Sequence, residues 1–286
     1  MTFSVPLGLR YMLLSALGFS LMAAGVKQAS NYNIPVLEIV AVRAIVSLLL
    51  SYLDVKRKRI SIWGTSKGLL FARGTVGSIA LMSLYFAVST LPLAEATLLQ
   101  YTYPAFTVVL ALLFLKEKMQ FATVICIGLS ILGLIIMMLP NINSESELPS
   151  VSVIAALVGA FFSAIAYILV RKLSQTEDTS VIIFYFPLIA LPSSLILLGS
   201  DFVIPDSQSL ILLIAIGIFT QIGQIGLTKA MAVETAGKAA AYSYVQVIFA
   251  IVLGIVLFDN TPNLWTWVGG SFIMFGALFN ALYKRQ

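Results

Sequence analysis

Residues 121–139 read FATVICIGLSILGLIIMML, a run of 19 residues without a single charged side chain. As an α-helix, a run of this length extends about 30 Å, which matches the hydrocarbon core of a lipid bilayer. The strict alternation of apolar and polar residues that is typical of a barrel strand is missing. The segment therefore predicts a membrane-spanning helix, because a lone segment in lipid must satisfy its own backbone hydrogen bonds.

The composition of the whole chain agrees with this segment. Of its 286 residues, 60% are hydrophobic and only 10% are charged, and the mean hydropathy is +1.02. A soluble domain has about 25% charged residues, so this chain lacks the polar groups to cover a water-exposed surface. It has no histidine, and its one cysteine, Cys126, cannot form an intrachain disulfide. Histidine-based catalysis and the usual zinc sites are excluded, so we expect no catalytic residue, no metal site and no cofactor.

Nine further apolar runs have the length of a membrane span. Together with residues 121–139, the ten expected helices cover residues 7–28, 35–53, 68–91, 94–115, 121–139, 151–170, 179–198, 208–231, 237–258 and 264–283. The sequence therefore predicts an all-α polytopic membrane protein with ten transmembrane helices.

Basic residues predict the orientation of these helices, because cytoplasmic loops are enriched in Lys and Arg. Fourteen of the 17 basic residues fall on one side of the membrane if the N-terminus is inside: Arg10, Lys56, Arg57, Lys58, Arg59, Lys67, Lys116, Lys118, Arg171, Lys172, Lys229, Lys238, Lys284 and Arg285. Both termini are thus predicted to be cytoplasmic. The basic run at residues 56–59 follows a span directly, so we interpret it as a topology anchor and expect no nucleic-acid partner.

An internal repeat relates the two halves of the chain. A shift of 143 residues aligns residues 84–117 with residues 227–260 without a gap, and seven of these 34 positions are identical. The identical pairs are Leu84 and Leu227, Ala87 and Ala230, Ala96 and Ala239, Tyr101 and Tyr244, Phe106 and Phe249, Val109 and Val252, and Leu110 and Leu253. Residues 1–143 and 144–286 then form two five-helix domains. Because five is odd, the second must be inverted relative to the first, an architecture that recurs in secondary transporters.

Several local motifs resemble a known family. They are Ser15-Ala-Leu-Gly-Phe-Ser20, Arg43 within the second helix, Leu91-Pro-Leu-Ala-Glu-Ala96, Pro104, and Leu115-Lys-Glu-Lys118. With the ten helices and the repeat, they resemble the drug/metabolite transporter superfamily of the EamA type over essentially the whole chain. The resemblance implies that the first four helices of each half surround a central cavity and that the fifth is peripheral. The residue equivalent to Glu117 is Asn260, so any role of that acid belongs to one half only.

Two arginines within the spans are the first candidates for a substrate site, because charged groups in a membrane face the bundle interior or water. Arg43, Ser47 and Ser51 recur every fourth residue and form one polar stripe on the second helix. Arg43 either lines the cavity or has a structural role, paired with Glu38 or with backbone carbonyls. Arg73 lies nearer the predicted cytoplasmic end of its helix, where it either lines the cavity or snorkels toward the headgroups.

Polar stripes on other helices supply the remaining candidates. On the eighth helix Thr220, Gln224 and Thr228 share a face beside Gln221, and on the ninth Tyr242 and Gln246 share another. In the repeat, Tyr103 is the residue equivalent to Gln246. The predicted substrate-binding residues are therefore Arg43, Arg73, Tyr85, Tyr101, Tyr103, Gln221, Gln224, Tyr242 and Gln246. Each amide can also serve as interhelical glue.

These observations predict a secondary transporter, an exporter or exchanger, for small organic metabolites. The chain has no Gly-x-x-x-x-Gly-Lys-Ser/Thr motif for direct use of ATP. A cationic cavity favours anionic or zwitterionic substrates such as amino acids or carboxylates. Two alternatives stay open: a flippase for a lipid or lipid-linked sugar, and a multidrug or cation exporter in which Arg43 points away or is neutralised by Glu38. The expected partners are a small-molecule substrate and the bilayer, with a homodimer left open, and the expected location is the bacterial inner membrane.

Overall fold

The computed structural model describes residues 6–30, 32–91, 93–139, 149–259 and 262–283. Every regular element within these ranges is a helix, which confirms the predicted all-α class. The expected domain boundary at residue 143, the residues Asn260, Lys284 and Arg285, and both extreme termini lie outside the described ranges.

Twelve α-helices occupy the described part of the chain. They are α1 (Leu7–Ser30), α2 (Val36–Lys58), α3 (Lys67–Thr90), α4 (Leu93–Gln100), α5 (Tyr103–Phe114), α6 (Phe121–Met138), α7 (Ser150–Leu173), α8 (Thr179–Leu198), α9 (Ser207–Val233), α10 (Ala236–Tyr242), α11 (Val245–Phe258) and α12 (Leu264–Leu282). Eight segments are long and apolar enough to cross a membrane, α10 and α11 counting as one, and shorter apolar helices cover Tyr103–Phe114 and Leu264–Asn280. Each of the ten predicted apolar segments thus corresponds to one helix or to a pair of helices, and the protein is an integral multi-pass membrane protein.

Two predicted helices are interrupted, which corrects the sequence-based prediction. The expected helix at 94–115 is the pair α4 and α5, and the expected helix at 237–258 is the pair α10 and α11. Each pair is separated by a two-residue turn, at residues 101–102 and 243–244 respectively. The two turns are one residue out of register with the 143-residue shift, so the chain is interrupted at nearly the same place in both halves.

Different side chains produce the two interruptions. In the first half Pro104 has no amide hydrogen, and its ring would collide with the carbonyl of Gln100 if the helix continued. In the second half Ser243 donates its hydroxyl to the Ala240 carbonyl at 2.6 Å. This bond supplies the carbonyl with a donor other than the next helical amide, which helps end α10 at Tyr242.

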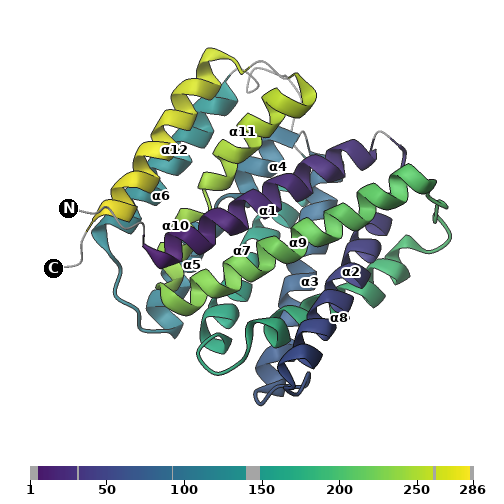
Figure 1. Ribbon diagram of the computed structural model, residues 1–286. Helices are drawn as coiled ribbons and strands as arrows, with labels where there is room; N and C mark the ends of the chain where they lie inside the picture. Colours follow the sequence, from purple (N-terminus) through teal and green to yellow (C-terminus); the bar gives the residue numbers. More distant parts are fainter. Residues whose placement is uncertain (1–5, 31, 92, 140–148, 260–261, 284–286) are drawn as a thin grey trace.

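Four helix pairs dominate the packing (Figure 1). α1 packs along α9, α3 packs along α7, and α2 packs along α8. The fourth pair, α6 with α12, lies side by side at the edge of the bundle. Because α1 and α7 open the two halves and α3 and α9 follow at equivalent positions, the first two pairs exchange when the halves are exchanged.

Glycine allows the closest of these contacts. A Cβ atom on Gly18 of α1 would lie 2.7 Å from the backbone nitrogen of Gly223 on α9, and one on Gly226 would lie 2.6 Å from the backbone nitrogen of Ser15. The Ser15 hydroxyl also donates to the Gly223 carbonyl at 2.8 Å. Backbones that approach this closely fix α1 against α9 and thereby one wall of the bundle interior.

Candidate functional site

A cavity of about 300 Å³ lies at the centre of the bundle. Side chains of α1, α2, α3, α4, α5, α7, α8, α9 and α11 line it, together with Tyr101 in the turn between α4 and α5. None of the described residues that line it comes from α6, α10 or α12. Its volume is at the lower end of the range that small-molecule sites occupy.

Seven of the nine sequence-predicted site residues line this cavity. They are Arg43, Arg73, Tyr85, Tyr101, Tyr103, Gln224 and Gln246. The remaining lining residues are Phe19, Met22, Ala23, Gly77, Ala80, Leu81, Leu84, Gln100, Ser163, Ala166, Tyr167, Phe186, Thr220 and Leu227. The cavity wall therefore combines two cations, several amides and hydroxyls, and an apolar remainder, with no carboxylate among its described residues.

Arg43 projects from α2 and is 6% exposed. Its guanidinium donates to the thioether sulfur of Met22 at 3.5 Å, and a thioether is a weak acceptor. The suggested pair with Glu38 does not form between these described residues. One oxygen of the buried Glu38 accepts the Val203 amide hydrogen at 3.0 Å, and the other has no partner in the described chain.

Arg73 projects from α3 and is 4% exposed, so it does not snorkel to the headgroups. Its guanidinium lies over the ring of Phe186, 5.0 Å from the ring centre. Its Nε and Nη1 atoms are buried and have no hydrogen-bond partner in the described part of the chain. Gly77 makes room for this arrangement, because a Cβ atom there would lie 2.3 Å from Arg73 Nη1 and 2.9 Å from the Phe186 ring.

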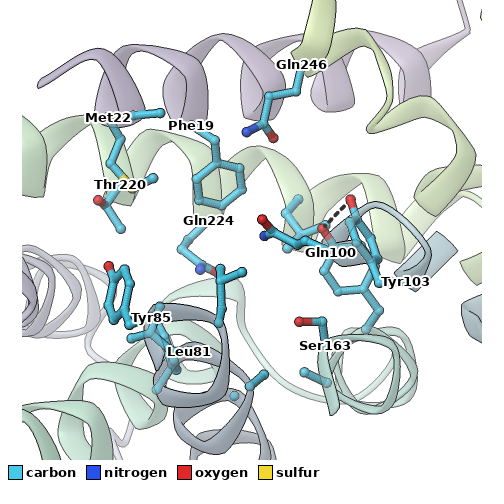
Figure 2. Close-up of a pocket in the computed structure, with 18 of the residues that line it drawn as sticks. Phe19, Met22, Leu81, Tyr85, Gln100, Tyr103, Ser163, Thr220, Gln224 and Gln246 are labelled. Atoms are coloured by element: carbon cyan, nitrogen blue, oxygen red, sulfur yellow. Dashed lines mark hydrogen bonds between the residues drawn. The ribbon is translucent and has the colours of Figure 1, made fainter. Parts of the chain in front are cut away.

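Three amide side chains reach the cavity from different helices. Figure 2 shows Gln100 at the end of α4, Gln224 on α9 and Gln246 on α11 turned toward a common space. Hydrogen bonds from these amides to other described residues are absent, and the Gln246 backbone carbonyl, by contrast, accepts the Ser20 hydroxyl. All three side chains are half-buried, and their amides are available to bind a solute or water.

Tyrosine hydroxyls join the two interrupted helices beside the cavity. Tyr167 on α7 donates to the Tyr103 hydroxyl at 3.3 Å, and Tyr103 in turn donates to the hydroxyl of Ser243 in the turn between α10 and α11. Tyr244 stacks on Tyr101 with 5.9 Å between ring centres, and its hydroxyl donates to the Tyr101 carbonyl at 2.9 Å. Tyr101 and Tyr244 are 143 residues apart, so this contact joins equivalent positions of the repeat.

Gln221 and Tyr242 are not among the described residues that line the cavity. Gln221 is buried, and its amide donates to the Ser51 hydroxyl at 2.9 Å, which links α9 to α2. Tyr242 is fully buried in a hydrophobic core, and its hydroxyl has no partner in the described chain.

Gln100, Tyr167 and Phe186 line the cavity but were missed by the sequence argument. Gln100 is a lone amide in an apolar run, with no polar residue four positions away. Tyr167, by contrast, belongs to the i, i+4 stripe of Ser163, Tyr167 and Arg171, so a usable signal was overlooked. Phe186 had a usable signal, because it lies 143 residues after Arg43.

The same shift relates more of the cavity wall. Six pairs of lining residues lie 143 positions apart: Ala23 and Ala166, Arg43 and Phe186, Gly77 and Thr220, Leu81 and Gln224, Leu84 and Leu227, and Tyr103 and Gln246. Equivalent positions of both halves thus face the same space, although their chemistry differs.

Ionic contacts gather at the basic end of the bundle, away from the cavity. Lys58 at the end of α2 pairs with Asp178 at 2.9 Å, and Arg171 at the end of α7 pairs with Glu117 at 2.9 Å. Glu177 accepts the amide hydrogens of Thr65 and Ser66 at 2.8 and 2.5 Å. Partial burial raises the pKa of Glu177, but hydrogen bonds from the Thr65 hydroxyl and from these amides outweigh it and lower that pKa below the usual value.

Comparison with known proteins agrees with this arrangement. A model of the EamA-like transporter family matches the chain twice, over residues 6–139 and 150–282. One solved crystal structure superimposes with a TM-score of 0.79 over 94% of this chain and 96% of its own, at 17% sequence identity, and therefore shares the fold.

Curated relatives include bacterial and mammalian proteins. The pseudopaline exporter CntI of Pseudomonas aeruginosa strain UCBPP-PA14 is 31% identical over 279 residues, which cover 97% of each chain. Solute carrier family 35 member G1 of Mus musculus is 31% identical over 297 residues, which cover 98% of this chain and 79% of that protein.

Proposed function

The chain belongs to the EamA-like transporter family, and from this premise we propose that it exports a small anionic or zwitterionic metabolite by alternating access. Family membership makes it a membrane transporter and not an enzyme. The direction of transport rests on the name of the pseudopaline exporter, which covers nearly the full length of this chain.

The cavity is the observation that supports the substrate class. Two guanidinium groups, Arg43 and Arg73, face one space that no described carboxylate lines. Charged groups inside a membrane protein require a counter-ion or water, and a bound anion is the partner that this cavity lacks. The free amides of Gln100, Gln224 and Gln246 supply hydrogen bonds for the rest of the solute.

Alternating access requires two bodies that move about the site, and we propose that these are two inverted five-helix halves. The two family matches, the exchange of the α1–α9 and α3–α7 pairs, and the six equivalent lining pairs all support this division. The interrupted helices support it as well, because broken helices at matching places mark substrate sites in transporters built from inverted repeats.

We propose that the basic end of the bundle is cytoplasmic, with both termini on that side, and that the protein resides in a bacterial inner membrane. Lys58 and Asp178 join the first half to the second there, as do Thr65 and Glu177. In alternating access these contacts must open when the cavity reaches the cytoplasm.

The cation-exporter alternative is less compatible with the geometry. It requires Arg43 to point away from the cavity or to be neutralised by Glu38, whereas Arg43 lines the cavity and Glu38 binds the Val203 amide. The flippase alternative requires a lateral opening to lipid, and we retain it as an outcome of the test.

The proposal is tested by ligand-induced stabilisation followed by transport. The purified protein is screened by thermal shift against amino acids, carboxylates, nucleotides, sugars and cationic drugs, since a ligand at 100 times its Kd stabilises by about 2.7 kcal/mol. Each ligand that stabilises is then measured by counterflow in proteoliposomes. We expect an anion or zwitterion to stabilise the wild type more than it stabilises Arg43→Gln.

Arg57→Gln is the matched control, because it removes the same charge from an exposed side chain at the end of α2. Stabilisation by cations alone, equal in all three proteins, contradicts the proposed substrate class. Translocation of a fluorescent lipid in proteoliposomes, without flux of any water-soluble compound, supports the flippase instead.

A further inference from the structure

The cavity holds two positive charges that the chain itself does not neutralise. Arg43 is 6% and Arg73 is 4% exposed, and no described Asp or Glu lines the space that they share. Elsewhere the chain pairs buried or half-buried cations with acids, as Arg171 with Glu117 and Lys238 with Glu234. Arg43 and Arg73, which face the cavity, thus differ from these cations in having no acidic partner among the described residues.

Arg73 is positioned as a preformed anion-binding group. The ring of Phe186 covers one face of its guanidinium at 5.0 Å, and the missing side chain of Gly77 gives Nη1 its place. Stacking occupies the face of the guanidinium but leaves the N–H groups in its plane free to donate. Two of its nitrogens, Nε and Nη1, are buried without a partner in the described chain. Nε shares one edge of the guanidinium with Nη2, and Nη1 shares another edge with Nη2, so a carboxylate bound at either edge in bidentate fashion satisfies one of these two donors.

Arg43 is a second such group, on the helix that precedes α3 in the chain. Its described hydrogen bond goes to the Met22 sulfur, an acceptor that an oxygen anion easily outcompetes. The nearest acid along α2, Glu38, is committed to the Val203 amide. Arg43 and Arg73 thus face the cavity from α2 and α3 with donors available to a solute.

Charge balance decides how many anionic groups the solute carries. Two like charges in one cavity repel each other, and each loses hydration on burial. A solute with a single carboxylate neutralises one guanidinium and leaves the other buried without a counter-ion. Resting on the proposed function, we propose that the substrate is a small organic dianion with two separate anionic groups, one bound by Arg43 and the other by Arg73.

The rest of the cavity limits the size and polarity of this solute. About 300 Å³ accommodates a small molecule only. The amides of Gln100, Gln224 and Gln246 bind hydroxyl, carbonyl or amino groups between the two anionic ends, while Phe19 and Leu227 contact its carbon skeleton.

The test compares ligands that differ only in the number and placement of charges. Thermal-shift titrations of the purified protein use straight-chain dicarboxylates of four to six carbons, monocarboxylates of matched length, alanine and glycerol 3-phosphate. We expect the dissociation constant of at least one dicarboxylate to be at least about tenfold lower than that of its monocarboxylate, since each charge-assisted hydrogen bond adds this much or more. Glycerol 3-phosphate carries its charge on one group and is expected to bind like a monocarboxylate.

Variants assign the two anionic groups. Arg43→Gln and Arg73→Gln are each expected to weaken dicarboxylate binding about tenfold or more, while monocarboxylate binding falls about threefold or less because the remaining arginine still binds it. Arg73→Lys keeps the charge but not the bidentate geometry and is expected to recover part of the affinity. Arg57→Gln is expected to match the wild type. Without ligand, both Gln variants are expected to melt no lower than the wild type, because a buried unpaired charge has been removed.

Outcomes separate this inference from the proposed function. Alanine or a monocarboxylate could bind as tightly as every dicarboxylate, with no effect of one arginine variant. In that case the inference of a dianionic substrate is wrong, and the proposed transport of a monoanion or zwitterion is unaffected. If glycerol 3-phosphate alone binds tightly, the two charges belong to a single group and the inference is overturned. If no anion binds and cations do, both proposals fail.

Discussion

The two halves of the chain build the same wall from different chemistry. At three pairs of equivalent lining positions, the first half has Arg43, Gly77 and Tyr103 where the second has Phe186, Thr220 and Gln246. Both cavity arginines belong to the first half. Two of the three free amides, Gln224 and Gln246, belong to the second.

From this difference we infer that packing and the proposed substrate recognition rest on different positions of the proposed repeat. Small and apolar positions such as Ala23 and Ala166, or Leu84 and Leu227, are retained between halves because they set how closely helices approach. Charged positions are not retained. An anion is therefore expected to bind to the arginines of α2 and α3. The second half is expected to contribute neutral hydrogen bonds and the ring of Phe186, which stacks on Arg73.

The largest effect on stability is expected at the α1–α9 interface, which is tighter than the equivalent α3–α7 interface. An added Cβ on Gly226 would meet α1 backbone atoms of Ser15 and Tyr11 at 2.6 Å, whereas one on Gly159 would meet α3 backbone atoms at 3.3 Å. Gly226→Ala is expected to destabilise by about 3 kcal/mol or more, because backbones must separate. Gly159→Ala is expected to remain within about 1 kcal/mol, since the helix preference of alanine offsets a milder contact.

Melting temperature and yield in detergent measure both variants. Gly128→Ala is the control, because its Cβ would meet nothing within 4 Å. Equal melting of Gly226→Ala and Gly128→Ala would contradict the tighter α1–α9 interface.

A smaller loss of stability is expected when the ion pair between Arg171 and Glu117 is removed. Arg171 binds Glu117 at 2.9 Å and donates to the Met231 and Ala232 carbonyls. The residues equivalent to Arg171 and Glu117 are Gln28 and Asn260, so the repeat offers no second copy of this pair. Arg171→Met is expected to destabilise by about 2 kcal/mol, because two carbonyls and a half-buried carboxylate lose a donor.

The neighbouring Lys172→Met is the matched control, since Lys172 is exposed. If both variants melt alike, the pair is not a structural feature of the basic end.

The fold follows from the sequence to a large extent because bilayer thickness imposes one element length. All ten apolar runs are helical, and the run at 121–139 differs from α6 by a single residue. The turns at 101–102 and 243–244 were not predicted. Proline disfavours a helix interior, so Pro104 offered a signal for the first turn. Ser243 ends α10 through a bond to the Ala240 carbonyl, which composition does not reveal.

The cavity was predictable where polar residues recur every fourth position and elusive where they stand alone. Arg43 and Gln224 belong to such stripes, whereas Gln100 does not. Tyr167 recurs with Ser163 and Arg171 every fourth residue, so its stripe was overlooked rather than absent. Periodicity also cannot tell which neighbour a polar face meets. Gln221 was grouped with Gln224, yet it lies three residues earlier on α9, and its amide donates to Ser51 on α2. Substrate binding by the nine predicted residues stays a prediction.

A further contrast between the halves lies at Gly77 and Thr220, which occupy equivalent lining positions. Gly77→Ala is expected to weaken anion binding about tenfold, because its Cβ would displace the Arg73 guanidinium from the Phe186 ring. Folding is expected to change little, since the displaced atoms are the ends of movable side chains. Thr220→Ala is expected to bind within about twofold of the wild type, as its hydroxyl donates to the Ile216 carbonyl of its own helix at 2.8 Å.

Isothermal titration of both variants with the tightest-binding anion measures this contrast. Equal anion affinity of the two variants would mean that anion binding does not depend on the position of the Arg73 guanidinium over the Phe186 ring.

The smallest effect is expected at Glu177, whose equivalent in the first half is the buried Ile34. Hydrogen bonds from Thr65 and Ser66 lower the pKa of Glu177 against the opposing effect of burial, so the folded protein favours the carboxylate. A carboxyl group with a lowered pKa stabilises the fold above its unfolded pKa, about 4.5, and this stabilisation disappears as the pH falls through the folded value. Glu177→Gln is therefore expected to lower stability by about 0.5–1 kcal/mol at pH 7, with the difference from wild type shrinking as the pH falls below 4.5 and through the lowered pKa of Glu177. Melting curves from pH 7 to well below 4.5 measure it, with the exposed Asp201→Asn as control. A difference that does not shrink as the pH falls below 4.5 would mean that Glu177 acts through its shape and not through its charge.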